Sequence, residues 1–418
     1  MKHILVINQH GENRGDEAAM RAMLARFQHE LGEGEVRFTV LCQFRDRNLK
    51  LQFTEPVETL PIVLPPLDYL RLGLFSAGHA SGLQPDRVLS PVMRKIIDAY
   101  RSADLVVSAP GGPYFGDIYA SHELVHWWYV WLGARFGKPL FLYAPSAGPF
   151  KHRALNPIRR RMYSKFDVLV TREELSAEHL RGLLGPSVEV HVTADSAIQS
   201  TVPALPRSTY FGGDRASLAQ RFLVAVSLNN YRYPGAADPD ACRARYDEAM
   251  LQLLRHLATR RESHFLFLPQ LYGAVHSDVP YLKRMAEQLG AGVSWEMVDP
   301  EADSDQQRRI FAMCDLHLAS RYHPAIFGHL GCVPGLCLYY EHKALGFMQQ
   351  VELERFAFDI RKPDPVELCR AADELLDQRT NLVTHLRDCV PALQKRAQRT
   401  TELAVELLRH GPVRTAPV

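Results

Sequence analysis

The sequence has no paired-cysteine motif, and its seven cysteines are scattered and odd in number. This pattern argues against a disulfide framework and favours free thiols in a reducing compartment, so we expect a cytoplasmic protein. Neither sign of charge is in excess, because 49 Lys and Arg face 47 Asp and Glu, for a formal net charge of +2. The balance excludes a general attraction to nucleic acid, and any basic site must be local.

Long hydrophobic runs are also missing. The longest apolar stretch, residues 124–132, is interrupted by His126 and followed by Arg135 and Lys138. It falls well short of the roughly 20 residues that a membrane-spanning helix needs. The chain opens on an apolar strand pattern at residue 3, without the features of a secretory signal. We expect neither export nor a membrane crossing, while peripheral contact with a membrane stays open.

Several motifs that would define a reaction are absent as well. The sequence has no GxGxxG or GxxxxGK[ST] loop and no GxSxG elbow. Simple hydrolases and common nucleotide folds therefore lose support. His317, His323 and His329 are spaced six residues apart, so a metal site is an alternative, but the short i, i+4 pairing that places two imidazoles on one helical face is missing. We expect no metal.

What the sequence does contain is an alternation of short apolar runs with helical patterns. The first series has expected strands at 3–8, 36–44, 103–111, 139–148 and 166–172. After a linker at 200–219, a second series has expected strands at 222–230, 264–270, 294–299 and 314–321. Such runs, with helices between them, are typical of buried parallel sheets. The 418 residues predict an α/β protein with two Rossmann-like lobes, 1–205 and 206–418, a cleft between them, and a helical tail from about residue 364.

Ligands of open α/β sheets bind beyond the carboxyl ends of the strands, so the loops at those ends are the first candidates for a site. These loops are Asn13–Glu17, Ala109–Pro113, Ser146–Pro149, Thr171–Glu174 and Ser320–Pro324. Asp16 and Glu17 would either cap a helix or contact hydroxyl groups of a bound molecule. Gly111 and Gly112 would either form an ordinary turn or let the backbone approach a phosphate or carboxylate.

Arg321 and His323 lie two residues apart just after an apolar strand, so both can face one pocket if the chain stays extended. Taken alone, such a pair is more typical of a core histidine beside a surface arginine. Two other groups have plain explanations too. The basic residues at 151–153 and 159–161 would form a solvated face or meet a diphosphate, and the aromatic helix at 127–131 would pack on the sheet or touch a lipid-linked acceptor.

Taken together and in order, the motifs from Asn13 to about Leu353 resemble the polysaccharide pyruvyl transferase family. The matching segments are N-x-G-D-E at 13–17, P-G-G at 110–112, A-G-P at 147–149, T-R-E-E-x-S at 171–176, A-D at 194–195, P-Q at 269–270 with Asp278, S-R-Y-H at 320–323, G-C-V-P at 331–334 and Y-x-x-K at 340–343. The resemblance implies two Rossmann-like lobes similar to the B-type glycosyltransferases.

The resemblance also implies a reaction in which phosphoenolpyruvate is the donor substrate, no cofactor is needed, and a pyruvate ketal bridges two sugar hydroxyls. It carries over Arg172, Arg321, His323 and Lys343 as functional residues. By their chemistry, we expect His323 to donate the proton and Lys343 to neutralise the leaving phosphate. We expect Arg172 and Arg321 to bind substrate, together with Asn13, Asp16, Gly111, Gly112 and Gln270 of the matching motifs. Arginine suits phosphate and carboxylate, and histidine suits protonation of the methylene carbon.

Tyr322 and Pro324 stand where family members often have other residues, and the acceptor therefore stays open among a sugar, a nucleotide-sugar and a lipid-linked glycan. Two rival functions remain. One is a glycosyltransferase that uses the same two-lobed fold with a nucleotide-sugar donor. The other is a non-catalytic sugar-binding protein. The oligomeric state is not predicted.

Overall fold

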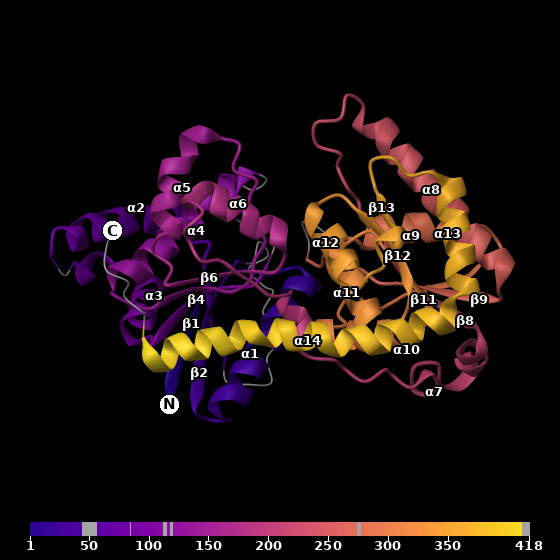
Figure 1. The fold of residues 1–418 in the computed structure, drawn as a ribbon, viewed down its shortest axis with the longest axis horizontal. Helices are drawn as coiled ribbons and strands as arrows, with labels where there is room; N and C mark the ends of the chain where they lie inside the picture. The colour runs from indigo at the N-terminus through magenta and orange to yellow at the C-terminus, as the bar shows by residue number, and fades with distance from the viewer. Residues whose placement is uncertain (44–56, 84, 112–114, 118–119, 274–276, 412–418) are drawn as a thin grey trace. The chain divides into compact units, whose positions relative to one another are not determined.

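The structure is a computed structural model, and it describes residues 1–43, 57–83, 85–111, 115–117, 120–273 and 277–411. Its described strands form two parallel sheets, each with helices in the connections between strands (Figure 1). The predicted α/β class with two Rossmann-like sheets is confirmed.

The first sheet follows the order β3-β2-β1-β4-β5-β6-β7, and its strand pairs are parallel. Its strands are β1 (Lys2–His10), β2 (Val36–Gln43), β3 (Val57–Pro61), β4 (Leu105–Ser108), β5 (Leu140–Leu142), β6 (Val168–Thr171) and β7 (His191–Val192). Its helices are α1 (Arg14–Leu31), α2 (Pro66–Ala80), α3 (Pro91–Ser102), α4 (Ala120–Arg135), α5 (Asn156–Tyr163) and α6 (Glu174–Leu184), with short turns η1 (Asp86–Val88), η3 (Arg153–Leu155) and η4 (Ser196–Gln199). The strand order reverses between β1 and β4.

The second sheet follows the order β10-β9-β8-β11-β12-β13 and is also parallel. Its strands are β8 (Phe222–Ser227), β9 (Ser263–Phe267), β10 (Ser294–Met297), β11 (Leu316–Ala319), β12 (Gly335–Tyr339) and β13 (Ala357–Asp359). The helices that accompany it are α7 (Arg207–Tyr210), α8 (Pro239–Arg260), α9 (Val279–Glu287), α10 (Ser304–Met313), α11 (Tyr322–Leu330), α12 (His342–Gln350) and α13 (Pro365–Asp377), with turns η5 (Gly213–Gln220) and η6 (Glu354–Phe356). The order reverses between β8 and β11, which makes that edge the expected ligand side.

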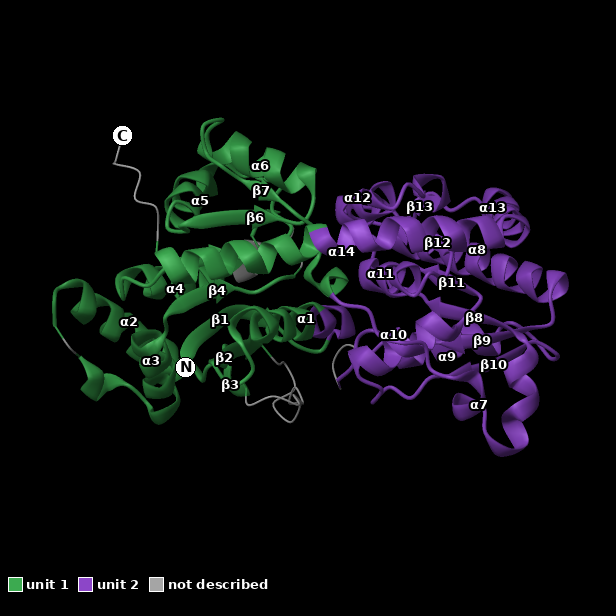
Figure 2. Cartoon of the chain, turned by 60° about the horizontal axis from the view of Figure 1, so that its bottom comes forward, with its two compact units in different colours: residues 1–12, 19–199, 396–418 green, residues 13–18, 200–395 purple. Residues whose placement is uncertain are grey.

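The chain divides into two compact units (Figure 2). Unit 1 comprises residues 1–12, 19–199 and 396–418, and unit 2 comprises residues 13–18 and 200–395. The sequence placed the change of lobe at 205/206. The contacts group 200–205 with the second unit, and they assign the two ends of α14 (Arg379–His410) to different units. Pro391 lies in the interior of that helix.

The interior of unit 1 shows why its strands are nearly continuous apolar runs. Leu5 and Ile7 of β1 belong to one buried cluster, while Ile4 and Val6 belong to another. Because successive side chains of a strand point to opposite faces, a sheet that is covered on both faces needs apolar residues at every position. The aromatic helix contributes to one of these clusters, since Trp127 is buried within it.

Candidate functional site

The carboxyl edge of the second sheet carries three of the predicted side chains at the starts of two helices. Arg321 precedes α11 and His323 lies in its first turn, directly after β11. Lys343 lies in the first turn of α12, after the neighbouring strand β12. Since the first backbone N–H groups of a helix lack intrahelical partners, such starts favour bound anions. Two of them, with added cations, make this edge a candidate anion site.

Tyr322 connects the two helix starts. The Nζ of Lys343 lies 5.8 Å from the centroid of the Tyr322 ring, and that ring lies 5.0 Å from the ring of His323. Lys343 also forms an ion pair with Glu341, with an Nζ to Oε2 distance of 2.7 Å. Both side chains are nearly buried, at 11% and 9% exposure. Lys343 and His323 therefore belong to one cluster, and it includes a carboxylate that the sequence analysis did not single out.

Arg321 is fixed by Asp278, a buried residue at the start of α9. Its Nη2 donates to Oδ1 of Asp278 over 2.6 Å, while the backbone N–H groups of Gln270 and Leu271 donate to Oδ2 over 3.1 and 2.9 Å. Burial alone would lower the pKa of Arg321, but Asp278 outweighs it and raises that pKa. The Nε of Arg321 and the Oε1 of Gln270 are buried, and neither has a hydrogen-bond partner in the described part of the chain.

The loop after β1 belongs to unit 2, although the sequence analysis assigned it to the N-terminal lobe. Asn13 forms an isolated bridge with Leu271, and the N–H of Arg14 donates to the carbonyl of Gln270 over 3.0 Å. The guanidinium of Arg14 donates to the carbonyl of Pro300 and stacks 3.8 Å from the ring of Tyr272. These contacts, made across more than 250 positions of sequence, place the loop beside the candidate site.

Gly15 explains the glycine of the N-x-G-D-E motif. A methyl group on Gly15 would lie 1.9 Å from the Nδ1 of His323, which is far below any contact distance. The motif therefore packs directly against the predicted proton donor. Asp16 is buried next to it. Glu17 pairs with Arg14 at 2.8 Å and accepts from the N–H of Ser304 at 3.4 Å, so its carboxylate holds the loop in unit 2.

Arg172, in unit 1, is buried among several hydrogen-bond and ion-pair partners. It follows β6 and is 1% exposed. Its Nη1 lies 2.6 Å from Oδ2 of Asp195, its Nε donates to Ser146 over 2.8 Å, and Glu173 lies 3.4 Å away. Arg159, in the basic cluster, is likewise buried between Asp117 and Glu123. Both arginines are enclosed by partners within their own unit.

The remaining predicted residues follow β4. Gly111 is buried, and its carbonyl accepts from the N–H of Ser146 over 3.3 Å. Gly112 lies outside the described residues. Of the predicted residues, the structure brings six together in unit 2: Asn13, Asp16, Gln270, Arg321, His323 and Lys343. Arg172 and Gly111 belong to unit 1.

The histidine triplet divides between different environments. His317 and His329 are fully buried, with ring centroids 4.6 Å apart, and their Nδ1 atoms bond to the carbonyls of Val333 and Ala325. Burial holds the pKa of His317 well below its ordinary value and lowers that of His329 to about 4. His323 instead faces the Gly15 loop. Within the described ranges, no group of three His, Cys, Asp or Glu side chains is arranged to hold a metal ion.

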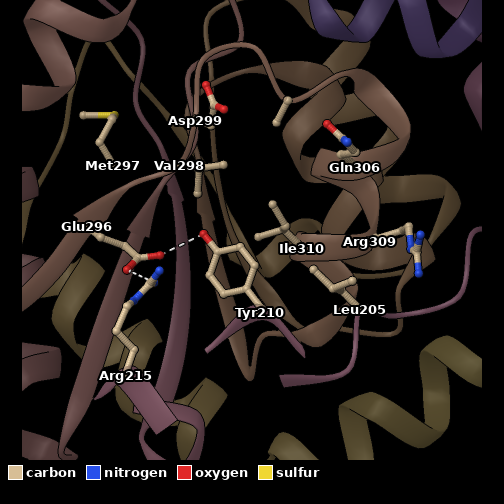
Figure 3. A pocket seen from close by; sticks show the side chains of 11 residues that line it. Leu205, Tyr210, Arg215, Glu296, Met297, Val298, Asp299, Gln306, Arg309 and Ile310 are labelled. Atoms are coloured by element: carbon tan, nitrogen blue, oxygen red, sulfur yellow. Dashed lines mark hydrogen bonds and ion pairs between the residues drawn. The ribbon is translucent and has the colours of Figure 1, made fainter. Parts of the chain in front are cut away.

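Figure 3 shows a pocket of about 550 Å³ elsewhere in unit 2, beyond the end of edge strand β10. Its lining residues are Leu205, Tyr210, Arg215, Glu296, Met297, Val298, Asp299, Ala302, Gln306, Arg309 and Ile310. The carboxylate of Glu296 is turned toward Tyr210, which donates to it over 2.8 Å, and toward Arg215, with which it pairs. None of the predicted site residues lines this pocket, and its Glu296 is already compensated, so we place the candidate chemistry at the carboxyl ends of β11 and β12.

None of the helices in the described ranges contains an apolar stretch long enough to cross a bilayer.

Comparison with solved structures finds the fold of B-type glycosyltransferases. A Staphylococcus aureus MnaA–UDP structure is 14% identical, with a TM-score of 0.57 and full coverage of both chains. Sucrose-phosphate synthase from Thermosynechococcus elongatus is 13% identical, with a TM-score of 0.58 over 98% of this chain and 100% of that one. At this identity, the likeness describes the fold alone.

Sequence comparison identifies the family. The amylovoran biosynthesis protein AmsJ of Erwinia amylovora is 23% identical over 377 residues, which cover 86% of this chain and 88% of AmsJ. Residues 13–342 match the family model described as polysaccharide pyruvyl transferase. This range runs from the Asn13 loop to the start of α12 and so takes in nearly all of the candidate site. The chain therefore belongs to the polysaccharide pyruvyl transferase family.

Proposed function

We propose that this protein transfers the pyruvyl group of phosphoenolpyruvate to hydroxyls of a sugar or glycan precursor, forming a pyruvate ketal and releasing phosphate. The observation that carries the proposal is the cluster of Arg321, His323 and Lys343 at two neighbouring helix starts. Phosphoenolpyruvate carries a carboxylate and a phosphate, and both groups suit arginine, lysine and helix N-termini. Family membership and the likeness to AmsJ support a role in polysaccharide biosynthesis.

We assign roles to residues by chemistry. His323 donates the proton that the methylene carbon needs, and Lys343 offsets the charge of the departing phosphate. Arg321 binds an anionic group of the donor, since its Nε is buried and unsatisfied. Gln270 and Asn13 belong to the adjoining backbone contacts, and we extend the binding role to Asp16 of the same loop.

Arg172, Gly111 and Gly112 remain proposed substrate contacts from the first lobe, and we expect that lobe to receive the acceptor. The enclosure of Arg172 by Asp195 and Ser146 gives it a structural role as well. We further propose a cytoplasmic location, which the free cysteines support.

The alternative function is a glycosyltransferase with a nucleotide-sugar donor, which the likeness to the MnaA–UDP structure favours at the level of the fold. Thermal-shift titration separates the two functions, because a ligand that binds only the folded state raises its apparent stability. Phosphoenolpyruvate should raise the unfolding temperature, and UDP-sugars alone should raise it less. A clear shift with UDP-sugars and none with phosphoenolpyruvate would favour the glycosyltransferase.

A further inference from the structure

The carboxylates of Asp278 and Glu341 lie near Arg321 and Lys343 at the carboxyl ends of the second sheet's strands, and they are satisfied very differently. Asp278 accepts from the side chain of Arg321 and from two backbone N–H groups. Glu341 has one polar partner for its side chain among the described residues, the ammonium of Lys343 at 2.7 Å. The carboxylate of Asp278 therefore already accepts several hydrogen bonds, one of them from Arg321, whereas the carboxylate of Glu341 can still accept further hydrogen bonds.

The position of Glu341 is also unusual for its residue type. It is the N-cap residue of α12, but its side chain accepts no backbone N–H of that helix. Asp303, in contrast, caps α10 with a complete capping box. The carboxylate of Glu341 is directed to Lys343 and is 9% exposed. Through Lys343 and the ring of Tyr322, it belongs to the same cluster as His323.

We propose that Glu341 is a further catalytic residue, the base that removes the proton from the acceptor hydroxyl that adds first to phosphoenolpyruvate. This inference rests on the function proposed above. Ketal formation uses two hydroxyls and so releases two protons, of which one ends on the new methyl group and one on phosphate. His323 can give a proton to the methyl carbon and take one from a hydroxyl, but a second group must carry the other hydroxyl proton to phosphate.

The steps balance with these two residues. As the first hydroxyl oxygen bonds to C2, its proton passes to Glu341 and C3 receives a proton from His323. The bond from C2 to the phosphate oxygen then breaks, phosphate leaves with the electron pair, and the proton on Glu341 passes to it. The second hydroxyl oxygen bonds to C2, and its proton restores His323. Both residues end in their starting forms, and no oxidant or cofactor enters.

The ion pair gives this base a link to donor binding. Before the donor arrives, Lys343 neutralises Glu341. A phosphate that draws Lys343 toward itself leaves the carboxylate without its cation in a nearly buried site. A carboxylate that loses a neighbouring cation holds a proton more readily. Donor binding would thus activate Glu341 only when there is a donor for the acceptor to attack.

The test is Glu341→Gln, with exposed Glu354→Gln as the matched control in unit 2. Calorimetry with phosphoenolpyruvate measures donor affinity, and phosphate release with a panel of methyl glycosides and UDP-sugars measures turnover. We expect donor affinity to be unchanged or about two- to fivefold tighter, since glutamine no longer competes for Lys343, while turnover falls by about 10²-fold or more. The control should match the wild type in both measurements.

Glu341→Ala gives a second measurement, in which added formate should restore part of the lost turnover by supplying a carboxylate. Full turnover in Glu341→Gln would overturn the proposal. Weaker donor binding with no rescue by formate would also overturn it, because Glu341 would then serve only to orient Lys343. If wild-type protein bound no phosphoenolpyruvate, the proposed function itself would fail, and this outcome is distinct from both of the others.

Discussion

The two units place their strand-end arginines in opposite ways. In unit 2, Arg321 has one carboxylate partner, and its buried Nε has no hydrogen-bond partner in the described part of the chain. In unit 1, Arg172 is 1% exposed and is held by Asp195, Ser146 and Glu173. An arginine at the carboxyl end of a parallel strand is therefore not by itself a ligand site. What matters is how much of its charge the protein has already compensated, by one carboxylate at Arg321 and by two at Arg172.

The largest expected effect is a loss of turnover when His323, the predicted proton donor in unit 2, is replaced. His323→Gln keeps a polar side chain but cannot donate a proton to carbon, so turnover should fall by about 10²- to 10⁴-fold. Donor affinity should change far less. Phosphate release and calorimetry with phosphoenolpyruvate measure the two quantities, and His256→Gln, which removes a hydrogen bond with Asp373 in the same unit, serves as control. Normal turnover with weak donor binding would make His323 a phosphate contact instead.

The next effect is on stability and belongs to unit 1. Arg172→Met removes the guanidinium and leaves the carboxylate of Asp195 buried without its ion pair, so the free energy of unfolding should fall by about 3–5 kcal/mol. Arg181→Met is the control, because its ion pair with Glu174 is largely exposed and should be worth less than about 1 kcal/mol. Urea denaturation measures both. Equal stability of the two variants would show that the enclosed arginine is not structural, and unit 1 would again be open as an anion site.

The sequence could predict only those residues of the candidate site that lie in short contiguous motifs. Arg321 and His323 follow an apolar strand, so a common pocket for these two was expected, whereas Lys343 was assigned by the family resemblance. The strands β3, β7, β12 and β13 were not among those expected, and β7 has only two residues, too few for a recognisable pattern. The assignment of residues 13–18 to unit 2 could not be foreseen either.

That assignment depends on contacts between positions remote in sequence. Arg14 donates to the carbonyls of Gln270 and Pro300, and no local pattern encodes such pairs. The clash that a side chain on Gly15 would make with His323 is equally invisible without coordinates. Glu341 gave one usable signal, an acid two residues before a predicted catalytic lysine at a strand end. In the sequence that signal resembles an ordinary surface pair.

Lowering the pH should destabilise the fold of unit 2 more than that of unit 1. Burial lowers the pKa of His3 in unit 1 to about 4, but in unit 2 it lowers the pKa values of both His317 and His329. Below about pH 6.5 the unfolded chain takes up protons on these side chains, while folded His329 does not until about pH 4. Protonation therefore favours unfolding, and the stability present above pH 6.5 is lost as the pH falls.

For His329 alone, the change in pKa from 6.5 to about 4 corresponds to about 3 kcal/mol. Hydrogen exchange at pH 7 and pH 5 should show a larger loss of protection in α11 and β11 than in β1. His329→Leu should make the stability less dependent on pH. Equal loss of protection in both units would contradict this contrast.

The smallest effect compares the two arginines directly. Arg321→Lys keeps a positive charge opposite Asp278, but an ammonium lacks the planar array of donors that contacts a carboxylate and a ligand anion together. Affinity for phosphoenolpyruvate should fall about tenfold, equivalent to about 1.4 kcal/mol, with little change in unfolding temperature. Arg361→Lys, at an exposed pair with Asp359 in the same unit, should leave affinity unchanged. Arg172→Lys should weaken donor binding less than Arg321→Lys, because two carboxylates already compensate the charge of Arg172. If Arg172→Lys instead lost more affinity, the main clamp on the donor would belong to unit 1, and the contrast between the two arginines would be reversed.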